Sequence, residues 1–109
     1  MDLKILKSGY MTPSEFNTKY KEYLDKGHYG LDVEIPSIIK YLDEIFEQTL
    51  TKIPGFKYQQ IKIKWDCVCF YSNAGFNISR LIENKLNDLK YDHDAKEELE
   101  QENKECNSD

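Results

Sequence analysis

The spacing of the apolar residues changes at Pro54–Gly55, and this change limits the fold more than any other feature of the chain. Before it, residues 38–50 carry an apolar side chain every three to four positions, which is typical of an amphipathic helix. After it, Ile61, Ile63 and Trp65 alternate with lysines, which is the two-residue period of a strand. The chain therefore combines helices with strands, and we predict an α+β fold.

Three helices are predicted. The first begins with a capping box at Thr12–Glu15 and ends at Gly27, since glycine commonly follows a helix. The second opens at Pro36 and runs to about residue 52. The third is expected to be capped by Asn77, and its apolar stripe comprises Ile78, Leu81, Ile82, Leu86 and Leu89.

The strands are predicted at residues 56–65 and 68–72, joined by a turn at Asp66–Cys67 into an antiparallel hairpin. A bulge near Gln59–Gln60 lets the apolar residues on either side of it face one core. Residues 28–34 are predicted to be a connector, and Leu3–Leu6 is a candidate further strand. The expected order is α-α-β-β-α, with the helices packed on one face of a small antiparallel β-hairpin sheet.

Acidic charge is concentrated at the C-terminus. The 109 residues carry a net charge of -5, yet residues 92–109 hold eight acids against two bases, and residues 1–91 hold 12 acids against 13 bases. The C-terminal segment has few apolar residues with which to offset the cost of ordering its backbone. We predict one α+β domain over residues 1–91 and an acidic tail over 92–109, either disordered or a solvent-exposed extension of the last helix.

Composition also bears on the compartment. No apolar run approaches the length of a membrane span, and the first residues lack the apolar region of a secretory signal. Cys67, Cys69 and Cys106 are odd in number, and the first two point the same way along one strand, which is not a disulfide framework. We predict a cytoplasmic protein without a membrane partner.

The hairpin also carries a short motif. Residues 60–71 read Gln-Ile-Lys-Ile-Lys-Trp-Asp-Cys-Val-Cys-Phe-Tyr, which resembles the Q-[IV]-K-x-K-F-G-G-L-R-F-Y hairpin of small uncharacterised phage and bacterial proteins. Trp65 takes the place of the aromatic residue and Val68 that of the aliphatic one, whereas Asp66–Cys67 replaces the two glycines and Cys69 replaces arginine. The resemblance covers about residues 38–89. It implies an α-β-β-α unit of phage-like origin and supplies no activity or catalytic residue.

Histidines and cysteines do not form a recognisable catalytic or metal-binding pattern. A nucleophile needs an oriented base beside it, but His28 lies in a glycine-flanked connector and His93 at the start of the acidic tail. Cys67-Val-Cys69 lacks the spacing of a zinc knuckle. We therefore predict a protein that is not an enzyme, with no catalytic residue, no cofactor and no metal.

Lysines and aromatic residues share the first strand of the hairpin. Lys57, Lys62 and Lys64 alternate with Tyr58 and Trp65, a pattern that can contact single-stranded nucleic acid or can simply protect an edge strand from aggregation. The chain is also rich in tyrosine, which is enriched at the centres of protein interfaces. The candidate partner-binding residues are Tyr58, Lys62, Lys64, Trp65 and Tyr71, and the candidate acidic residues of the tail are Asp92, Asp94, Glu97, Glu98 and Glu100.

These observations lead to a hypothesis with one alternative. The hypothesis is a non-enzymatic protein-binding module, phage-encoded and active in the host cytoplasm, that inhibits a host defence protein or nuclease in the manner of an anti-CRISPR protein. The edge of the hairpin offers a further contact, pairing with a second copy of the chain. The alternative is a small nucleic-acid-binding accessory protein that uses Lys57, Lys62, Lys64 and Trp65.

Overall fold

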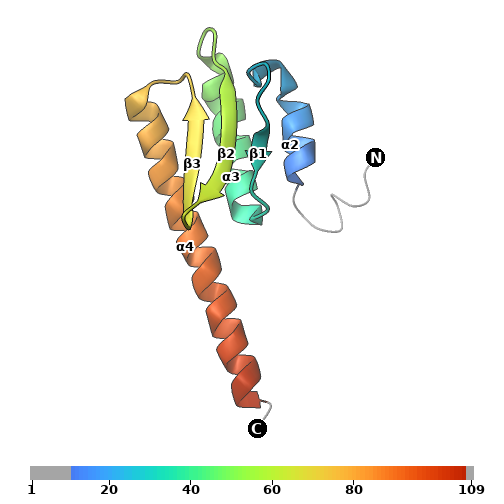
Figure 1. Cartoon of the computed structure of the whole chain (residues 1–109), viewed down its shortest axis with the longest axis vertical. Coiled ribbons are helices and arrows are strands. Elements are labelled where there is room, and N and C mark those ends of the chain that lie inside the picture. The colour runs from blue at the N-terminus through green and yellow to red at the C-terminus, as the bar shows by residue number, and fades with distance from the viewer. Residues whose placement is uncertain (1–10, 108–109) are drawn as a thin grey trace.

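A computed structural model describes the backbone of residues 11–107 and the side chains of residues 11–97. Three α-helices, two short 3-10 helices and three strands make up this part of the chain (Figure 1). In chain order they are α2 (Pro13–Lys19), η1 (Lys21–Tyr23), β1 (Gly30–Asp32), α3 (Pro36–Gln48), η2 (Leu50–Lys52), β2 (Tyr58–Lys64), β3 (Cys67–Ser72) and α4 (Phe76–Asn107). The candidate strand Leu3–Leu6 lies outside the described residues.

The α+β class is confirmed, but the predicted order of the elements and the purely antiparallel sheet were wrong. The order is α-β-α-β-β-α, and the sheet has three strands arranged β1-β2-β3. β1 pairs with β2 in parallel, whereas β2 pairs with β3 as the predicted antiparallel hairpin. The segment predicted as a connector contains β1, and α3 is the crossover that brings the chain back to lie parallel to it.

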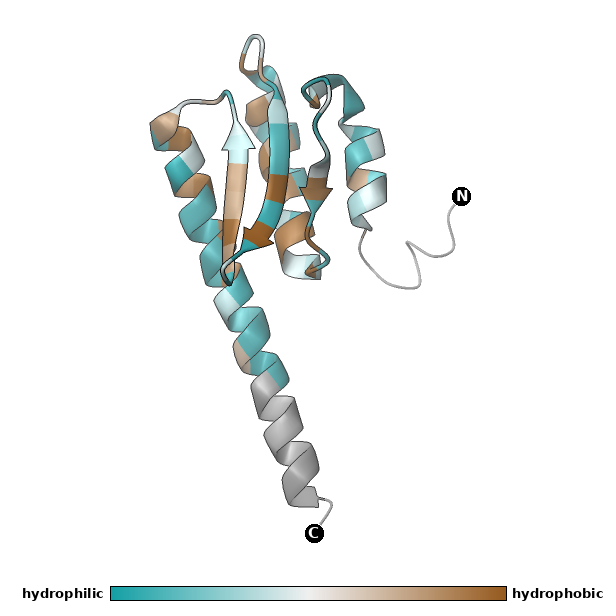
Figure 2. Ribbon diagram, in the orientation of Figure 1, coloured by the Kyte–Doolittle hydropathy of each residue, from teal (hydrophilic) through white to brown (hydrophobic). Residues whose placement is uncertain are grey.

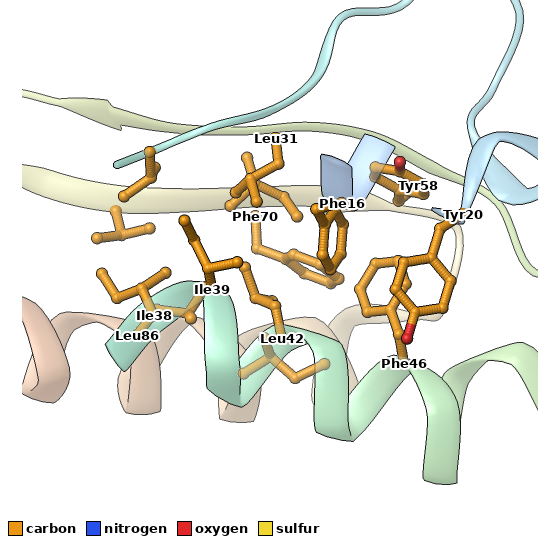
Figure 3. Close-up of a cluster of buried hydrophobic side chains, with 14 of the residues drawn as sticks. Phe16, Tyr20, Leu31, Ile38, Ile39, Leu42, Phe46, Tyr58, Phe70 and Leu86 are labelled. Carbon is orange, nitrogen blue, oxygen red and sulfur yellow. The ribbon is translucent and has the colours of Figure 1, made fainter. Parts of the chain in front are cut away.

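The core lies between the sheet and the helices that cover one of its faces (Figure 3). Phe46 of α3 is fully buried at its centre, where its ring packs against Phe16, Tyr20, Phe56 and Tyr58 with centroids 4.9–5.4 Å apart. The predicted bulge is confirmed by the register shift between Tyr58 and Gln60. It lets Tyr58 and Ile61 face the same core although an odd number of positions separates them.

Three helix ends differ from the prediction. Helix α3 ends at Gln48 and the 3-10 turn Leu50–Lys52 follows it, so the α-helix does not run to about residue 52. The capping box of Thr12 and Glu15 is present, but α2 ends at Lys19 and a 3-10 turn follows, well before Gly27. At the other end of the chain α4 begins at Phe76, so Asn77 is the second residue of the helix and not its cap. Leu81, predicted in the apolar stripe of this helix, is 70% exposed, whereas its neighbour Ile82 is buried in the core.

Helix α4 continues through Asn107 and projects away from the sheet in Figure 1. Its described C-terminal turns are hydrophilic, as the colouring of Figure 2 shows. Residues as far along as His93 and Lys96 still line a hollow together with Pro36 and Ser37 at the start of α3. The boundary at residue 91 between the domain and the tail stays a prediction. Among the described residues, no helix has the length and apolarity needed to cross a membrane.

Burial of Tyr58 predicts a loss of stability in alkaline solution. Desolvation raises the pKa of its hydroxyl from 10.0 to about 12. Between these pH values the unfolded chain has lost this proton and the folded chain still holds it, so the stabilisation present below pH 10 is lost as the pH rises towards about 12. Tyr20, whose hydroxyl pKa is raised by burial and by its hydrogen bond to Asp43, acts in the same direction.

We expect the free energy of unfolding to fall across this pH range by about 1.4 kcal/mol per pH unit for each such tyrosine. Urea unfolding followed by near-ultraviolet circular dichroism measures the slope, and Tyr58→Phe should make it shallower by that amount. Equal slopes in the wild type and in Tyr58→Phe would contradict the assignment. The variant also loses the hydrogen bond from the Tyr58 hydroxyl, which shifts the stability at every pH without changing the slope.

Candidate interaction surface

One face of the sheet is left open by the helices. Strand β2 places Gln60, Lys62 and Lys64 on it, because Ile61 between them points into the core. The neighbouring strand completes the face through three cross-strand pairs, which are Gln60 with Tyr71, Lys62 with Cys69 and Lys64 with Cys67. Lysines and a tyrosine predicted from the alternation of the sequence therefore lie side by side on this open face.

The hairpin turn is the most unusual part of the backbone. It comprises Trp65 and Asp66, one residue earlier than predicted, since Cys67 already pairs with Lys64. Both turn residues have positive φ, 53° for Trp65 and 64° for Asp66. A two-residue hairpin turn with φ above zero at both positions favours Asn-Gly or Asp-Gly, and a bulky side chain is strained there. Trp65 adopts this conformation with 85% of its surface exposed.

Helix α4 brings further groups next to this turn. Asp66 lines an open hollow of about 360 Å³ together with Asn87, Lys90, Tyr91 and Asp94. Tyr91 is 74% exposed, so two large exposed aromatic side chains, those of Trp65 and Tyr91, lie near the tip of the hairpin. The Lys90 ammonium lies 2.6 Å from an Asp94 carboxylate oxygen, and this hydrogen bond is the main cause that raises the pKa of Lys90.

The structure brings together most of the predicted partner-binding residues. Lys62, Lys64 and Tyr71 lie on the open face and Trp65 at its tip. Tyr58 does not belong with them, because it is fully buried and its hydroxyl donates a hydrogen bond to Asn17. Its place in the sequence beside Lys57 suggested a surface residue, but the bulge turns its side chain into the core.

The candidate acidic residues lie on α4, where the side chains of Asp92, Asp94 and Glu97 are described and those of Glu98 and Glu100 are not. His93, Asp94 and Glu97 come within 4.8 Å of one another. They belong to one helical turn, and His93 Nε2 lies 3.2 Å from a Glu97 carboxylate oxygen. We interpret this cluster as an ordinary contact between side chains three and four positions apart on one helix and assign no metal to it.

A second exposed cluster, at the start of α4, was not predicted from the sequence. Phe76 is 69% exposed and lines an open hollow of about 430 Å³ with Ser79, Arg80, Glu83 and Asn84. The Arg80 guanidinium lies over the Phe76 ring, 5.8 Å from its centroid. A single aromatic residue just after a glycine carries no periodic signal, so only the fold reveals its exposure.

Comparison of the chain with protein-family models, with curated proteins and with solved structures finds no match. The likeness of the hairpin motif to small phage and bacterial proteins therefore stays a prediction.

Proposed function

We propose that this protein is a non-enzymatic binding module for another protein, with Trp65 as the anchor of its contact surface. The observation that carries the proposal is the strained, exposed tryptophan at the tip of the hairpin. Exposing an indole in water and holding it at positive φ both cost free energy. Tryptophan is also the residue type most enriched among the few that dominate binding energy at protein interfaces. A binding role accounts for both costs.

The charges around the anchor favour a protein partner over nucleic acid. On the open face Lys62 lies opposite the acidic Asp32 of β1, and Lys64 precedes the turn that holds Asp66. The surface therefore alternates in sign instead of forming the basic patch that binds phosphates. Lys57, which belonged to the nucleic-acid alternative, instead donates from its ammonium to the Glu22 carbonyl oxygen.

The acidic turns of α4 indicate what kind of protein fits. Asp66 and Asp94 border the hollow beside Trp65, where Asp94 is paired with Lys90, and Glu97 follows three positions later on the same helix. A partner with a basic surface would complement these carboxylates. Enzymes that act on nucleic acids have such surfaces, and this is the support for a nuclease as the inhibited partner.

The test compares two exposed aromatic residues of the chain. Trp65→Asn removes the indole and keeps a residue that tolerates positive φ, so we expect the fold to be retained. Tyr29→Asn is the matched control, because Tyr29 is 81% exposed and precedes β1, away from the hairpin turn. Proteins captured from a lysate by the immobilised chain are identified, and the affinity of the enriched one is then measured by calorimetry.

We expect Trp65→Asn to weaken binding by about 30-fold or more, which corresponds to about 2 kcal/mol. Tyr29→Asn should leave the affinity within about twofold. Equal affinities for the wild type and Trp65→Asn would overturn the role of the anchor. Salt-sensitive binding of single-stranded DNA that is lost in Lys62→Ala/Lys64→Ala would instead establish the nucleic-acid alternative.

A stability measurement separates the two effects of Trp65. The double variant Trp65→Asn/Asp66→Gly gives the turn the residues that its backbone conformation prefers. We expect it to unfold at a higher urea concentration than the wild type while it fails to bind the partner. Such a result would show that the tryptophan is retained at a cost in stability, whereas a destabilised double variant would contradict the strain at this turn.

A further inference from the structure

The outer edge of β3 is bonded to side chains of α4 where a neighbouring strand would otherwise lie. The Asn87 side-chain amide accepts a hydrogen bond from the Val68 N–H at 2.8 Å and donates one to the Val68 carbonyl at 3.1 Å. One turn earlier, a Glu83 carboxylate oxygen accepts from the Phe70 N–H at 2.8 Å. These groups belong to Val68 and Phe70, whose N–H and C=O point away from β2 because alternate residues of an antiparallel strand direct these groups to opposite sides.

The opposite edge of the sheet has the same arrangement, built from a different helix. The Asn17 amide of α2 accepts from the Leu31 N–H at 2.8 Å and donates to the Leu31 carbonyl at 3.0 Å. Its oxygen also accepts from the Tyr58 hydroxyl at 3.0 Å, which fixes its orientation from inside the core. An asparagine side chain carries the same donor and acceptor as a peptide group. Each amide therefore makes the two hydrogen bonds that a residue of a neighbouring strand would make.

We infer that Asn17 and Asn87, with Glu83, seal both edges of the sheet against strand addition. An unpaired edge presents free N–H and C=O groups that pair readily with another chain. Here the outward groups of Leu31 and Val68 are already bonded on both sides of the sheet. Partners therefore contact this protein through its side chains and not by extending its sheet, and pairing of two copies through the hairpin edge is blocked.

The β3 edge is the one that would pair with a second copy once the seal is removed. It is six residues long against three for β1. Ile82 and Leu86, which anchor α4 in the core, are not the residues that bond the edge, so loss of Asn87 and Glu83 leaves that anchoring in place. Two β3 strands paired antiparallel through Val68 and Phe70 would set Cys69 of each copy directly opposite the other.

The test combines amide exchange with cross-linking. Although they lie on edge strands, the wild-type amides of Leu31, Val68 and Phe70 should exchange with solvent roughly 100-fold or more slowly than in an unfolded chain. In Asn87→Ala/Glu83→Ala, the Val68 and Phe70 amides should exchange at least about tenfold faster than in the wild type. Sedimentation velocity should show a dimer that grows with protein concentration. With Cys67→Ser and Cys106→Ser in the background, a short bismaleimide should join two copies through Cys69.

Matched variants identify the cause. Asn84→Ala removes an exposed asparagine of the same helix, and Glu83→Gln keeps an oxygen that can accept from Phe70. Both should stay monomeric and uncross-linked. A folded Asn87→Ala/Glu83→Ala variant that remains monomeric would overturn the inference, and so would fast exchange of the three edge amides in the wild type. If the double variant fails to fold, the exchange rates of the wild-type edge amides test the inference by themselves. None of these outcomes depends on Trp65, so they test the edge hydrogen bonds separately from the proposed binding role.

Discussion

Replacement of Phe46 by alanine should lower the free energy of unfolding by about 3–5 kcal/mol, because it removes the centre of the aromatic core. Phe46 has no exposed surface, and its ring lies 4.9 Å from that of Phe16 and 5.0 Å from those of Tyr20 and Tyr58. Phe16 belongs to α2, Tyr20 caps the end of that helix, and Tyr58 belongs to β2. The cavity left by the substitution could close only if several elements moved at once. Small domains have a free energy of unfolding of only about 5–15 kcal/mol, so the substitution would remove a large part of the total stability.

Urea unfolding measures this effect, with near-ultraviolet circular dichroism of the tyrosines as the signal. The fluorescence of Trp65 is a poor reporter, since its side chain is already exposed in the folded state. Phe76→Ala is the matched control: this ring is 69% exposed and contacts Arg80, and its loss should cost less than about 1 kcal/mol. Similar losses for the two variants would contradict the central position of Phe46.

Long runs of regular spacing made most of the fold predictable. The second helix was confirmed as α3 because its apolar residues keep helical spacing over 13 residues, and the hairpin was confirmed because β2 and β3 alternate. β1 was missed although its segment also alternates, with Leu31, Val33 and Ile35 buried and Asp32 and Glu34 exposed. Only three residues pair, and a stretch that short, preceded by Gly27 and beginning at Gly30, resembles a loop.

The interaction surface was predictable in part for the same reason. Alternation placed Lys62 and Lys64 on one face, and cross-strand pairing then brought Tyr71 beside them. Tyr58 was named as a contact residue although the bulge predicted near Gln59–Gln60 already turns the side chains before it towards the core, which is where the structure places it. Alternation does not show that Trp65 forms the turn, since an aromatic residue at positive φ contradicts ordinary turn preferences.

The edge seals lie beyond what a pattern in the sequence can show. Asn17 and Leu31 are 14 residues apart, and Asn87 and Val68 are 19 apart. Neither pair belongs to a common period, and an asparagine on a helix is usually a surface residue. Only the packing of α2 and α4 beside the sheet brings each amide to a strand edge.

Gly30→Ala should cost about 3–5 kcal/mol of folding free energy, through two separate effects. Gly30 has φ 79°, a conformation that costs an L-residue about 1–2 kcal/mol. A Cβ at this position would also lie 2.4 Å from Asn17 Oδ1 and 2.9 Å from Asn17 Cγ. The amide would have to move, and its hydrogen bonds to Leu31 and Tyr58, each worth about 0.5–1.5 kcal/mol, would be lost.

Two comparisons separate these effects. Gly27 has φ 81° and no atom within 4 Å of the position of a Cβ, so Gly27→Ala should cost only the backbone part, about 1–2 kcal/mol. In an Asn17→Ala background Gly30→Ala should cost no more than that, because the side chain it strikes is gone. Urea unfolding of the four members of this double-mutant cycle gives the coupling. Additive losses would show that the Asn17 amide does not depend on the missing Cβ of Gly30 for its hydrogen bonds at the β1 edge. A coupling of about 2 kcal/mol would show that it does.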